Sequence, residues 1–218
     1  MIAPKEHSNS IRSIEIGDFQ ASLKILEDFL SLPTRLEHFA MMDVFGGSTR
    51  GIGTLKDAIR ALSQHKATLR TIRLRGLSPG LRGFDLTDFE SLEELDLTAG
   101  CTGIEIGQEA QLLAPRLQKF TWTFALADHH GKGWNWFKQQ EEDWIRRFAQ
   151  AATERGSSLC EIFIDLQPFD DDSREEEIPD TYPFDRMDCI ASEIRGAGIT
   201  LSYPPPPISR EEYYALLR

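Results

Sequence analysis

The clearest candidates for chemistry lie in residues 125–137, ALADHHGKGWNWF, where Asp128, His129 and His130 stand side by side. Histidine and carboxylate side chains bind zinc or transfer protons, so this loop could serve an enzyme that acts on a small molecule. A zinc site needs three or four converging ligands, however, and adjacent residues of an extended segment point apart. The other histidines, His7, His38 and His65, are scattered along the chain. We therefore expect no metal and no cofactor, and the enzyme remains an alternative centred on this loop.

The sequence carries no nucleophile elbow, Walker A loop or zinc-protease helix motif. Residues 46–53, GGSTRGIG, are rich in glycine, but they lack the lysine–serine pair of a phosphate-binding loop and are typical of a flexible connector. The three cysteines, Cys101, Cys160 and Cys189, are far apart and odd in number, which argues against a disulfide framework or a C-x-x-C site. We expect reduced thiols and a protein that is not an enzyme.

The length of 218 residues allows one domain or at most two small ones, and we expect a single domain over residues 1–218. The net charge is −11, of which −6 falls in DDDSREEEIPD at residues 170–180, and no basic stripe suggests a nucleic-acid partner. No apolar run reaches about 18 residues, and the first residues lack the apolar core of a secretory signal. We therefore expect no membrane partner and an intracellular monomer, cytoplasmic or nuclear.

A repeated pattern defines the elements that must position these residues. The stretch LEELDL places Leu92, Leu95 and Leu97 as apolar-x-x-apolar-x-apolar. Six copies begin at Ile11, Leu36, Leu69, Leu92, Leu117 and Leu159, spaced 25, 33, 23, 25 and 42 residues apart. Leucine-rich repeats of about 20–29 residues carry this strand signature, and residues 198–203 suggest a seventh strand. The pattern predicts an α/β fold, a short leucine-rich-repeat solenoid or horseshoe with about six to seven parallel strands and helical connectors.

Helical patterns separate the predicted strands. One apolar helix face is expected from Leu23, Leu26, Phe29 and Leu30, and Thr54 and Asp57 resemble a capping box before the next helix. The long helix, 134–153, has an apolar stripe of Phe137, Trp144, Ile145, Phe148 and Ala152. Further helices are expected at 183–196 and from Ser209. Residues 10–133 would thus hold repeats, and residues 134–218 the long helix, the last repeats and a helical C-terminal cap.

The residues between the apolar positions point to the other face of the sheet, because strand side chains alternate. We expect this concave face to bind a protein partner through His38, Met42, Arg73, Arg75, Glu94, Asp96, Lys119, Thr121, Phe163 and Asp165. Ser13, Glu15, Gly17, Ala40, Thr71, Glu161, Thr98 and Thr123 share the face. Arg73 would lie beside Asp96, and Glu94 beside Lys119, either as a ladder of weak ion pairs or as a groove that binds a partner.

A second candidate surface is the loop with His129, His130, Trp134 and Trp136. Trp136 falls on a polar helix face, where it would either anchor a partner or pack under the neighbouring loop.

Four stretches, LLAPRLQKFTW, EEDWIRRFAQAATERGSSL, DRMDCIASEIRGAGITLSY and ISREEYY, together resemble leucine-rich-repeat proteins of filamentous fungi, many of them F-box-like. The resemblance implies a non-enzymatic recognition surface, which in this family sometimes delivers client proteins to a cullin–RING ubiquitin ligase. The first repeat begins at Ile11, which leaves no room for an N-terminal F-box. We therefore expect a recognition module, with a ligase-associated receptor that docks its adaptor by another surface as the alternative.

Overall fold

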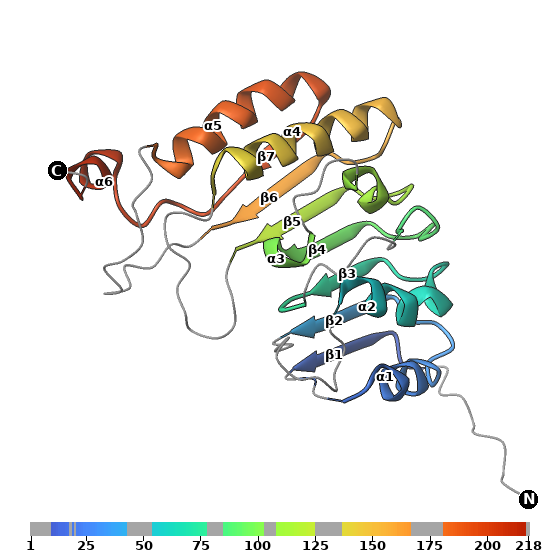
Figure 1. The fold of residues 1–218 in the computed structure, drawn as a ribbon. Helices are drawn as coiled ribbons and strands as arrows, with labels where there is room; N and C mark the ends of the chain where they lie inside the picture. Colours follow the sequence, from blue (N-terminus) through green and yellow to red (C-terminus); the bar gives the residue numbers. More distant parts are fainter. Residues whose placement is uncertain are drawn as a thin grey trace, which may run out of the picture.

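The computed structural model describes residues 10–17, 19, 21–42, 54–77, 85–102, 108–124, 137–166 and 181–216, in which helices follow most of the strands (Figure 1). The strands are β1 (Ser13–Gly17), β2 (His38–Met42), β3 (Thr71–Leu74), β4 (Glu94–Thr98), β5 (Lys119–Thr123), β6 (Glu161–Asp165) and β7 (Thr200–Ser202). The helices are α1 (Leu23–Leu30), α2 (Leu55–Leu62), α3 (Ala99–Thr102), α4 (Gln139–Glu154), α5 (Pro183–Ile194) and α6 (Arg210–Leu216). Short 3-10 helices lie at Ser63–His65, Glu109–Leu112 and Arg195–Ala197.

The seven strands form one parallel sheet in the order of the sequence, from β1 to β7. The central apolar positions of the predicted repeats align across this sheet: Ile14, Phe39, Ile72, Leu95, Phe120, Ile162 and Leu201. A slip of one residue would turn every apolar side chain to the opposite face, so the apolar pattern determines the register. The predicted α/β class and its parallel strands, including the seventh, are confirmed.

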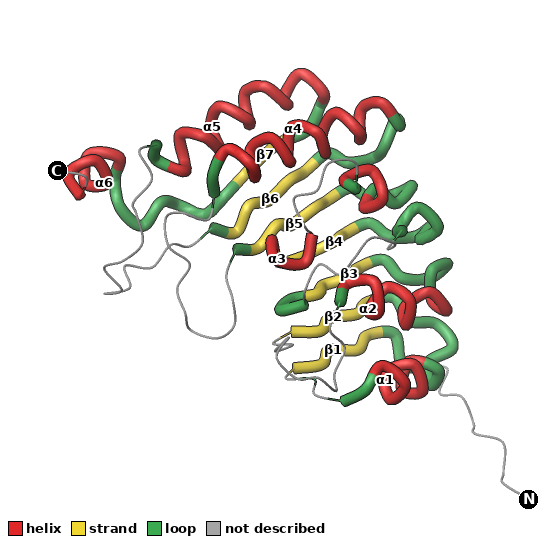
Figure 2. The backbone as a smooth tube through the Cα atoms, in the orientation of Figure 1, coloured by secondary structure: helices red, strands yellow, loops and turns green. Residues whose placement is uncertain are grey.

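The apolar core lies between the sheet and the helices. Helices α1, α2 and α4 gather along one side of the sheet (Figures 1 and 2). The alternation within each strand directs apolar side chains to this side, and Phe39 and Met41 of β2 and Ile72 and Leu74 of β3 are buried there. The opposite face carries no helix in the described part of the chain, and it is the face on which the candidate site lies.

Helix α4 packs an aromatic cluster onto β5. Trp144 stacks on Trp122 with ring centroids 4.5 Å apart, and Phe148 lies 4.9 Å from Phe120. Trp144, Ile145, Phe148 and Ala152 of the predicted apolar stripe lie on α4 and are buried, which confirms this part of the stripe; Phe137 is buried too, but it lies before the helix and not on it. The described helix begins at Gln139, where the backbone N–H of Lys138 donates to Glu141 at 2.8 Å and caps the first turn. No helix within the described ranges, α4 included, has the length and apolar character needed to cross a membrane.

The C-terminal elements cover the β7 end of the sheet. Helix α5 packs against both α4 and β7. The hydroxyl of Tyr182 donates to the carbonyl of Ile208 at 2.6 Å, and Tyr213 of α6 is fully buried. A capping box opens α6, because Ser209 N–H donates to Glu212 and Glu212 N–H donates to the Ser209 hydroxyl. These contacts place α5 against the last strand of the sheet, and a helical cap on the end of a repeat array stays a prediction.

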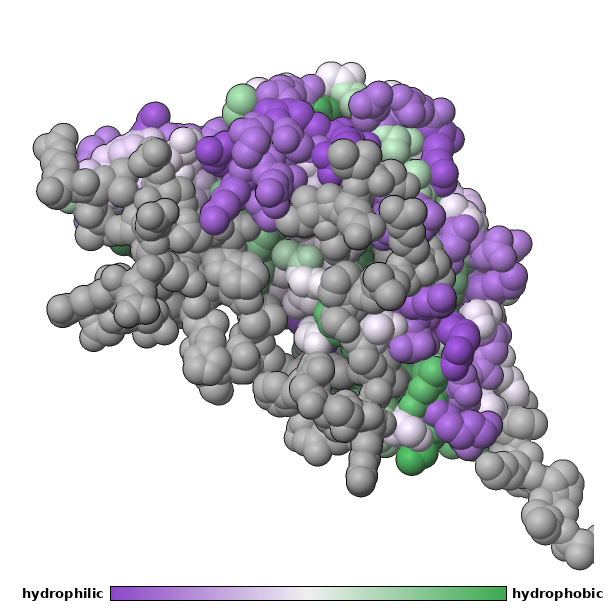
Figure 3. All heavy atoms as spheres, in the orientation of Figure 1, coloured by the Kyte–Doolittle hydropathy of each residue, from purple (hydrophilic) through white to green (hydrophobic). Residues whose placement is uncertain are grey.

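Helix α1 departs from the prediction at the other end of the sheet. Leu26 and Leu30 are buried as expected, but Phe29 is 43% exposed, and Ile25, one turn before it, is 54% exposed. Residues four apart share a helix face, so these two form an apolar surface over α1, where Figure 3 shows green side chains. The expectation that Phe29 joins the core was wrong, because among the described elements the helix that packs against α1 is α2, on one flank. The capping box expected at α2 is present in half: Asp57 N–H donates to the Thr54 hydroxyl at 3.2 Å, while the Asp57 carboxylate accepts from that hydroxyl and not from the Thr54 backbone.

Candidate functional site

On the face of the sheet opposite the helices, two rows of aligned side chains cross all seven strands. The first row runs Ser13, His38, Thr71, Glu94, Lys119, Glu161 and Thr200, and the second runs Glu15, Ala40, Arg73, Asp96, Thr121, Phe163 and Ser202. Neighbours within a row are one strand apart, about 4.8 Å. The register thus places Arg73 beside Asp96 and Glu94 beside Lys119, as the sequence predicts.

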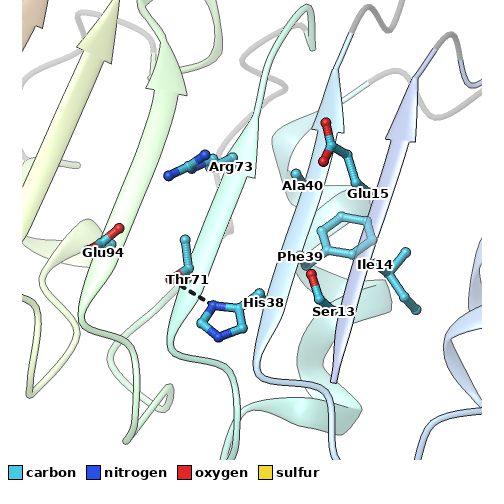
Figure 4. A pocket seen from close by; sticks show the side chains of 9 residues that line it. All are labelled: Ser13, Ile14, Glu15, His38, Phe39, Ala40, Thr71, Arg73 and Glu94. Carbon is cyan, nitrogen blue, oxygen red and sulfur yellow. Dashed lines mark hydrogen bonds between the residues drawn. The ribbon is translucent and has the colours of Figure 1, made fainter. Parts of the chain in front are cut away.

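A hollow of about 350 Å³ opens on this face over β1, β2, β3 and the start of β4. It is lined by Ser13, Ile14, Glu15, His38, Phe39, Ala40, Thr71, Arg73 and Glu94 (Figure 4). Ala40 is the second member of the second row, between Glu15 on β1 and Arg73 on β3. Its side chain is a single methyl group, so the hollow exists because long side chains on β1 and β3 flank a very short one on β2.

The charges around the hollow are exposed and unneutralised. Glu15, Arg73 and Glu94 are exposed, and none of them forms an ion pair with another described residue. The His38 ring is held by its Nδ1, which lies 3.1 Å from the hydroxyl oxygen of Thr71 on the next strand. The hollow therefore offers two carboxylates, one guanidinium and an oriented imidazole to whatever approaches this face.

The rest of the face is neutralised internally, in a pattern that differs from the predicted one. Arg75, not Arg73, pairs with Asp96 at 2.8 Å, and Lys119 pairs with Glu161 at 2.8 Å instead of with Glu94. Long side chains reach diagonal as well as direct neighbours across a sheet, so register alone does not decide which charges meet.

Burial also corrects the prediction at Asp96, which was expected to be exposed but is only 8% exposed. It accepts hydrogen bonds from Arg75 and, at 3.1 Å, from the hydroxyl of Thr123. Thr98 and Thr123 on the same face are buried as well. Because their polar groups are already used within the protein, these positions belong to the structure of the sheet more than to a binding surface.

The other candidate residues are dispersed. Met42, Thr121 and Asp165 are half-buried, and Phe163 lies under the ammonium group of Lys119, 5.9 Å from the ring centroid. Thr121 lies on β5, and Phe163 and Asp165 lie on β6, so these three lie beyond the strands that line the hollow. Met42 lies nearer to it, at the end of β2. The loop candidates His129, His130, Trp134 and Trp136, with the neighbouring Asp128, lie outside the described residues.

The described side chains bear on two kinds of reactive group, a metal site and a cysteine nucleophile. Within these ranges, no three histidine, cysteine, aspartate or glutamate residues are grouped so that they could hold a metal ion. Burial raises the pKa of the Cys101 thiol, whose sulfur lies 2.7 Å from the hydroxyl of Thr98, so this thiol stays protonated and unreactive near neutral pH. A hydrogen bond to Glu193 likewise raises the pKa of Cys189. Neither of these thiols has the lowered pKa that a cysteine nucleophile needs.

The sequence reasoning placed Ser13, Glu15, Ala40 and Thr71 on the correct face but did not select them as site residues. The sequence signal that could have identified them is Ala40, which has the smallest side chain in the second row and lies between the opposite charges of Glu15 and Arg73 on the two adjacent strands. Comparisons of the chain with protein-family models, with curated proteins and with solved structures gave no match in any of the three.

Proposed function

We propose that this chain is a leucine-rich-repeat solenoid that binds a partner protein on the face of its sheet opposite the helices, without catalysing a reaction. The parallel strands in sequence order, the helices on one side and the repeat spacings of 23 and 25 residues support the solenoid. Stacked repeats of this kind use their uncovered sheet as an extended binding surface. The partner would therefore lie across several strands.

The observation that carries the proposal is the hollow over Ala40 with its exposed charges. Elsewhere on the face the charged side chains are engaged with each other, as in the pairs of Arg75 with Asp96 and Lys119 with Glu161. Charges left without partners at a hollowed surface give a partner both shape and electrostatic complementarity. Among the described residues no three histidine, cysteine, aspartate or glutamate side chains are grouped so that they could hold a metal ion, so recognition fits the hollow better than metal-assisted catalysis.

Site-specific photo-cross-linking tests this function. A benzophenone amino acid would replace Ser13, which is exposed at the rim of the hollow, and in a control would replace Lys56, which is exposed on α2. After irradiation in an extract of the cells of origin, we expect a discrete adduct from the Ser13 position and none from the Lys56 position.

The identity of the adduct distinguishes two forms of the proposal. A cullin–RING adaptor in the adduct would favour the ligase-associated receptor, whereas a different protein would favour the plain recognition module. Equal adducts from both positions, or no adduct at Ser13, would contradict binding on this face.

A further inference from the structure

The charge balance of the hollow specifies what kind of side chain can enter it. Two carboxylates, Glu15 and Glu94, face one guanidinium, Arg73, so with a neutral His38 the hollow carries a net charge of −1. None of the three is engaged in an ion pair with another described residue. The entire chain adds to this field with its net charge of −11. A cation approaching the hollow is thus attracted both locally and at long range.

The orientation of the charged groups sharpens this conclusion. In Figure 4 the carboxylate of Glu15 leans from β1 toward Ala40, whereas the guanidinium of Arg73 points away from Ala40 toward β4. The space above the Ala40 methyl group therefore has a carboxylate at one wall and no cation inside it. Arg73 instead lies on the side of the hollow where Glu94 is found.

We infer that the partner inserts a lysine or arginine side chain into this hollow, above Ala40 and against Glu15, from a basic segment that crosses the first strands of the sheet. The inference rests on the proposed function and names the chemistry of the partner. The aliphatic stem of the inserted side chain would cover the Ala40 methyl group while its charged end reaches the Glu15 carboxylate. The Ser13 hydroxyl, also at the rim, can accept a further hydrogen bond from the same end.

An acidic side chain fits the same space poorly. It would meet the Glu15 carboxylate across the hollow, and like charges placed together at an interface are repelled. To reach Arg73 it would also have to pass to the β4 side, where Glu94 lies.

A peptide titration with charge variants tests the inference. The probe is a short, fluorescein-labelled, acetylated peptide of alternating lysine and serine, and its binding to the full chain is followed by fluorescence anisotropy. We expect Glu15→Lys to weaken binding by at least about tenfold, as loss and reversal of a charge-assisted contact should. The matched control is Glu90→Lys, which makes the same charge change at an exposed turn before β4 and should leave the affinity within about twofold.

A second variant tests the shape of the hollow without changing its charge. Ala40→Leu fills the space over β2, so it should weaken the lysine peptide about as much as Glu15→Lys does, while circular dichroism and thermal melting confirm that the variant is folded. Equal effects of Glu15→Lys and Glu90→Lys would reduce the attraction to non-specific charge and overturn the inference. Absence of lysine-peptide binding, or tighter binding of a matched glutamate–serine peptide, would overturn it as well.

The two proposals fail in different ways. If no adduct forms at Ser13, the recognition face itself is refuted. If an adduct forms but its yield is unchanged by Glu15→Lys and by Ala40→Leu, the face binds a partner and only the basic side chain in the hollow is refuted.

Discussion

Two acidic residues of β4, two positions apart on the same face, differ sharply in environment. Asp96 is buried and accepts hydrogen bonds from Arg75 and Thr123, whereas Glu94 is exposed at the rim of the hollow and forms no ion pair within the described chain. A buried carboxylate that satisfies buried donors contributes to folding, because its loss strands those donors. An exposed one without a partner contributes little and is free to act in binding.

This contrast predicts different costs for the same chemical change. Asp96→Asn removes the charge that neutralises Arg75, whose Nε is already buried without a hydrogen-bond partner, and should lower the free energy of unfolding by about 1–3 kcal/mol. Glu94→Gln, its matched control on the same strand, should change the free energy of unfolding by less than about 0.5 kcal/mol. Urea unfolding followed by circular dichroism measures both. Equal changes in the free energy of unfolding for the two variants would mean that the buried contacts of Asp96 do not stabilise the fold.

At the scale of elements, helices α4 and α5 are joined by a cluster of charged side chains. Arg146 of α4 donates to Glu142 and to Asp143 on its own helix and to Glu193 on α5, at 2.6 Å from its Nε. Arg186 of α5 donates to Glu142 at 2.9 Å. Glu142 is buried, so these guanidinium groups are what allow a carboxylate to lie between the two helices.

The link through Glu193 should depend on pH. The hydrogen bond from Arg146 holds the pKa of Glu193 below its ordinary value of 4.5. A carboxyl whose pKa is lower in the folded state stabilises the fold above its unfolded pKa, and this stability is lost as the pH falls through the lowered value. Glu193→Gln should therefore cost stability at pH 7, by less than about 1 kcal/mol because the side chain is partly exposed.

Below the lowered pKa, the wild type and Glu193→Gln should converge in stability, because the wild-type carboxyl is then protonated. Urea unfolding at neutral pH and at an acidic pH well below 4.5 measures the two differences. Glu90→Gln serves as the control, since Glu90 is exposed and has no arginine partner among the described residues. A difference for Glu193→Gln that is the same at both pH values would rule out the charge of this residue as the source of the effect.

The elements were predictable where a periodic apolar pattern determines them. Every strand of the sheet and its register followed from the alternation of apolar residues, because only one alignment buries all of them together. The ion pairs of Arg75 and Lys119 were not predictable in the same way, since each has more than one opposite charge within reach and the side-chain conformation selects among them. The prediction that Phe29 is buried was wrong for a different reason. Helical spacing shows which residues share a face, but it does not show whether another element covers that face.

The hollow was partly predictable. The face and most of its charges followed from the strand pattern, but the emphasis on Asp96 and Lys119 was misplaced because both are engaged with other charges of the protein. The apolar pattern does not show how long neighbouring side chains are. The short side chain of Ala40 leaves the space between the longer side chains of Glu15 and Arg73.

At the scale of the whole molecule, the two ends of the sheet are unequally supported. Each strand hydrogen-bonds only to the strands next to it in sequence, so each part of the sheet is stabilised by its own packing and by the interfaces with its immediate neighbours. The β5–β6 region rests on the 16-residue helix α4 and its stacked aromatic rings, with α5 packed against that helix. The β1–β2 end has the 8-residue helix α1, whose Ile25 and Phe29 remain exposed.

This asymmetry predicts that the molecule opens from the β1 end. In native-state hydrogen exchange, the amides of β2 should exchange at least about tenfold faster than those of β5, which corresponds to an opening free energy lower by about 1.4 kcal/mol. Leu30→Ala, which removes a buried side chain of α1, should accelerate exchange in β1 and β2 and leave β5 and β6 nearly unchanged. Phe148→Ala should accelerate exchange in β5 and β6, because it creates a cavity beneath them. If either variant instead accelerates all strands equally, the sheet opens as one cooperative unit, and partner binding at the hollow would then stabilise the entire fold instead of its weaker end.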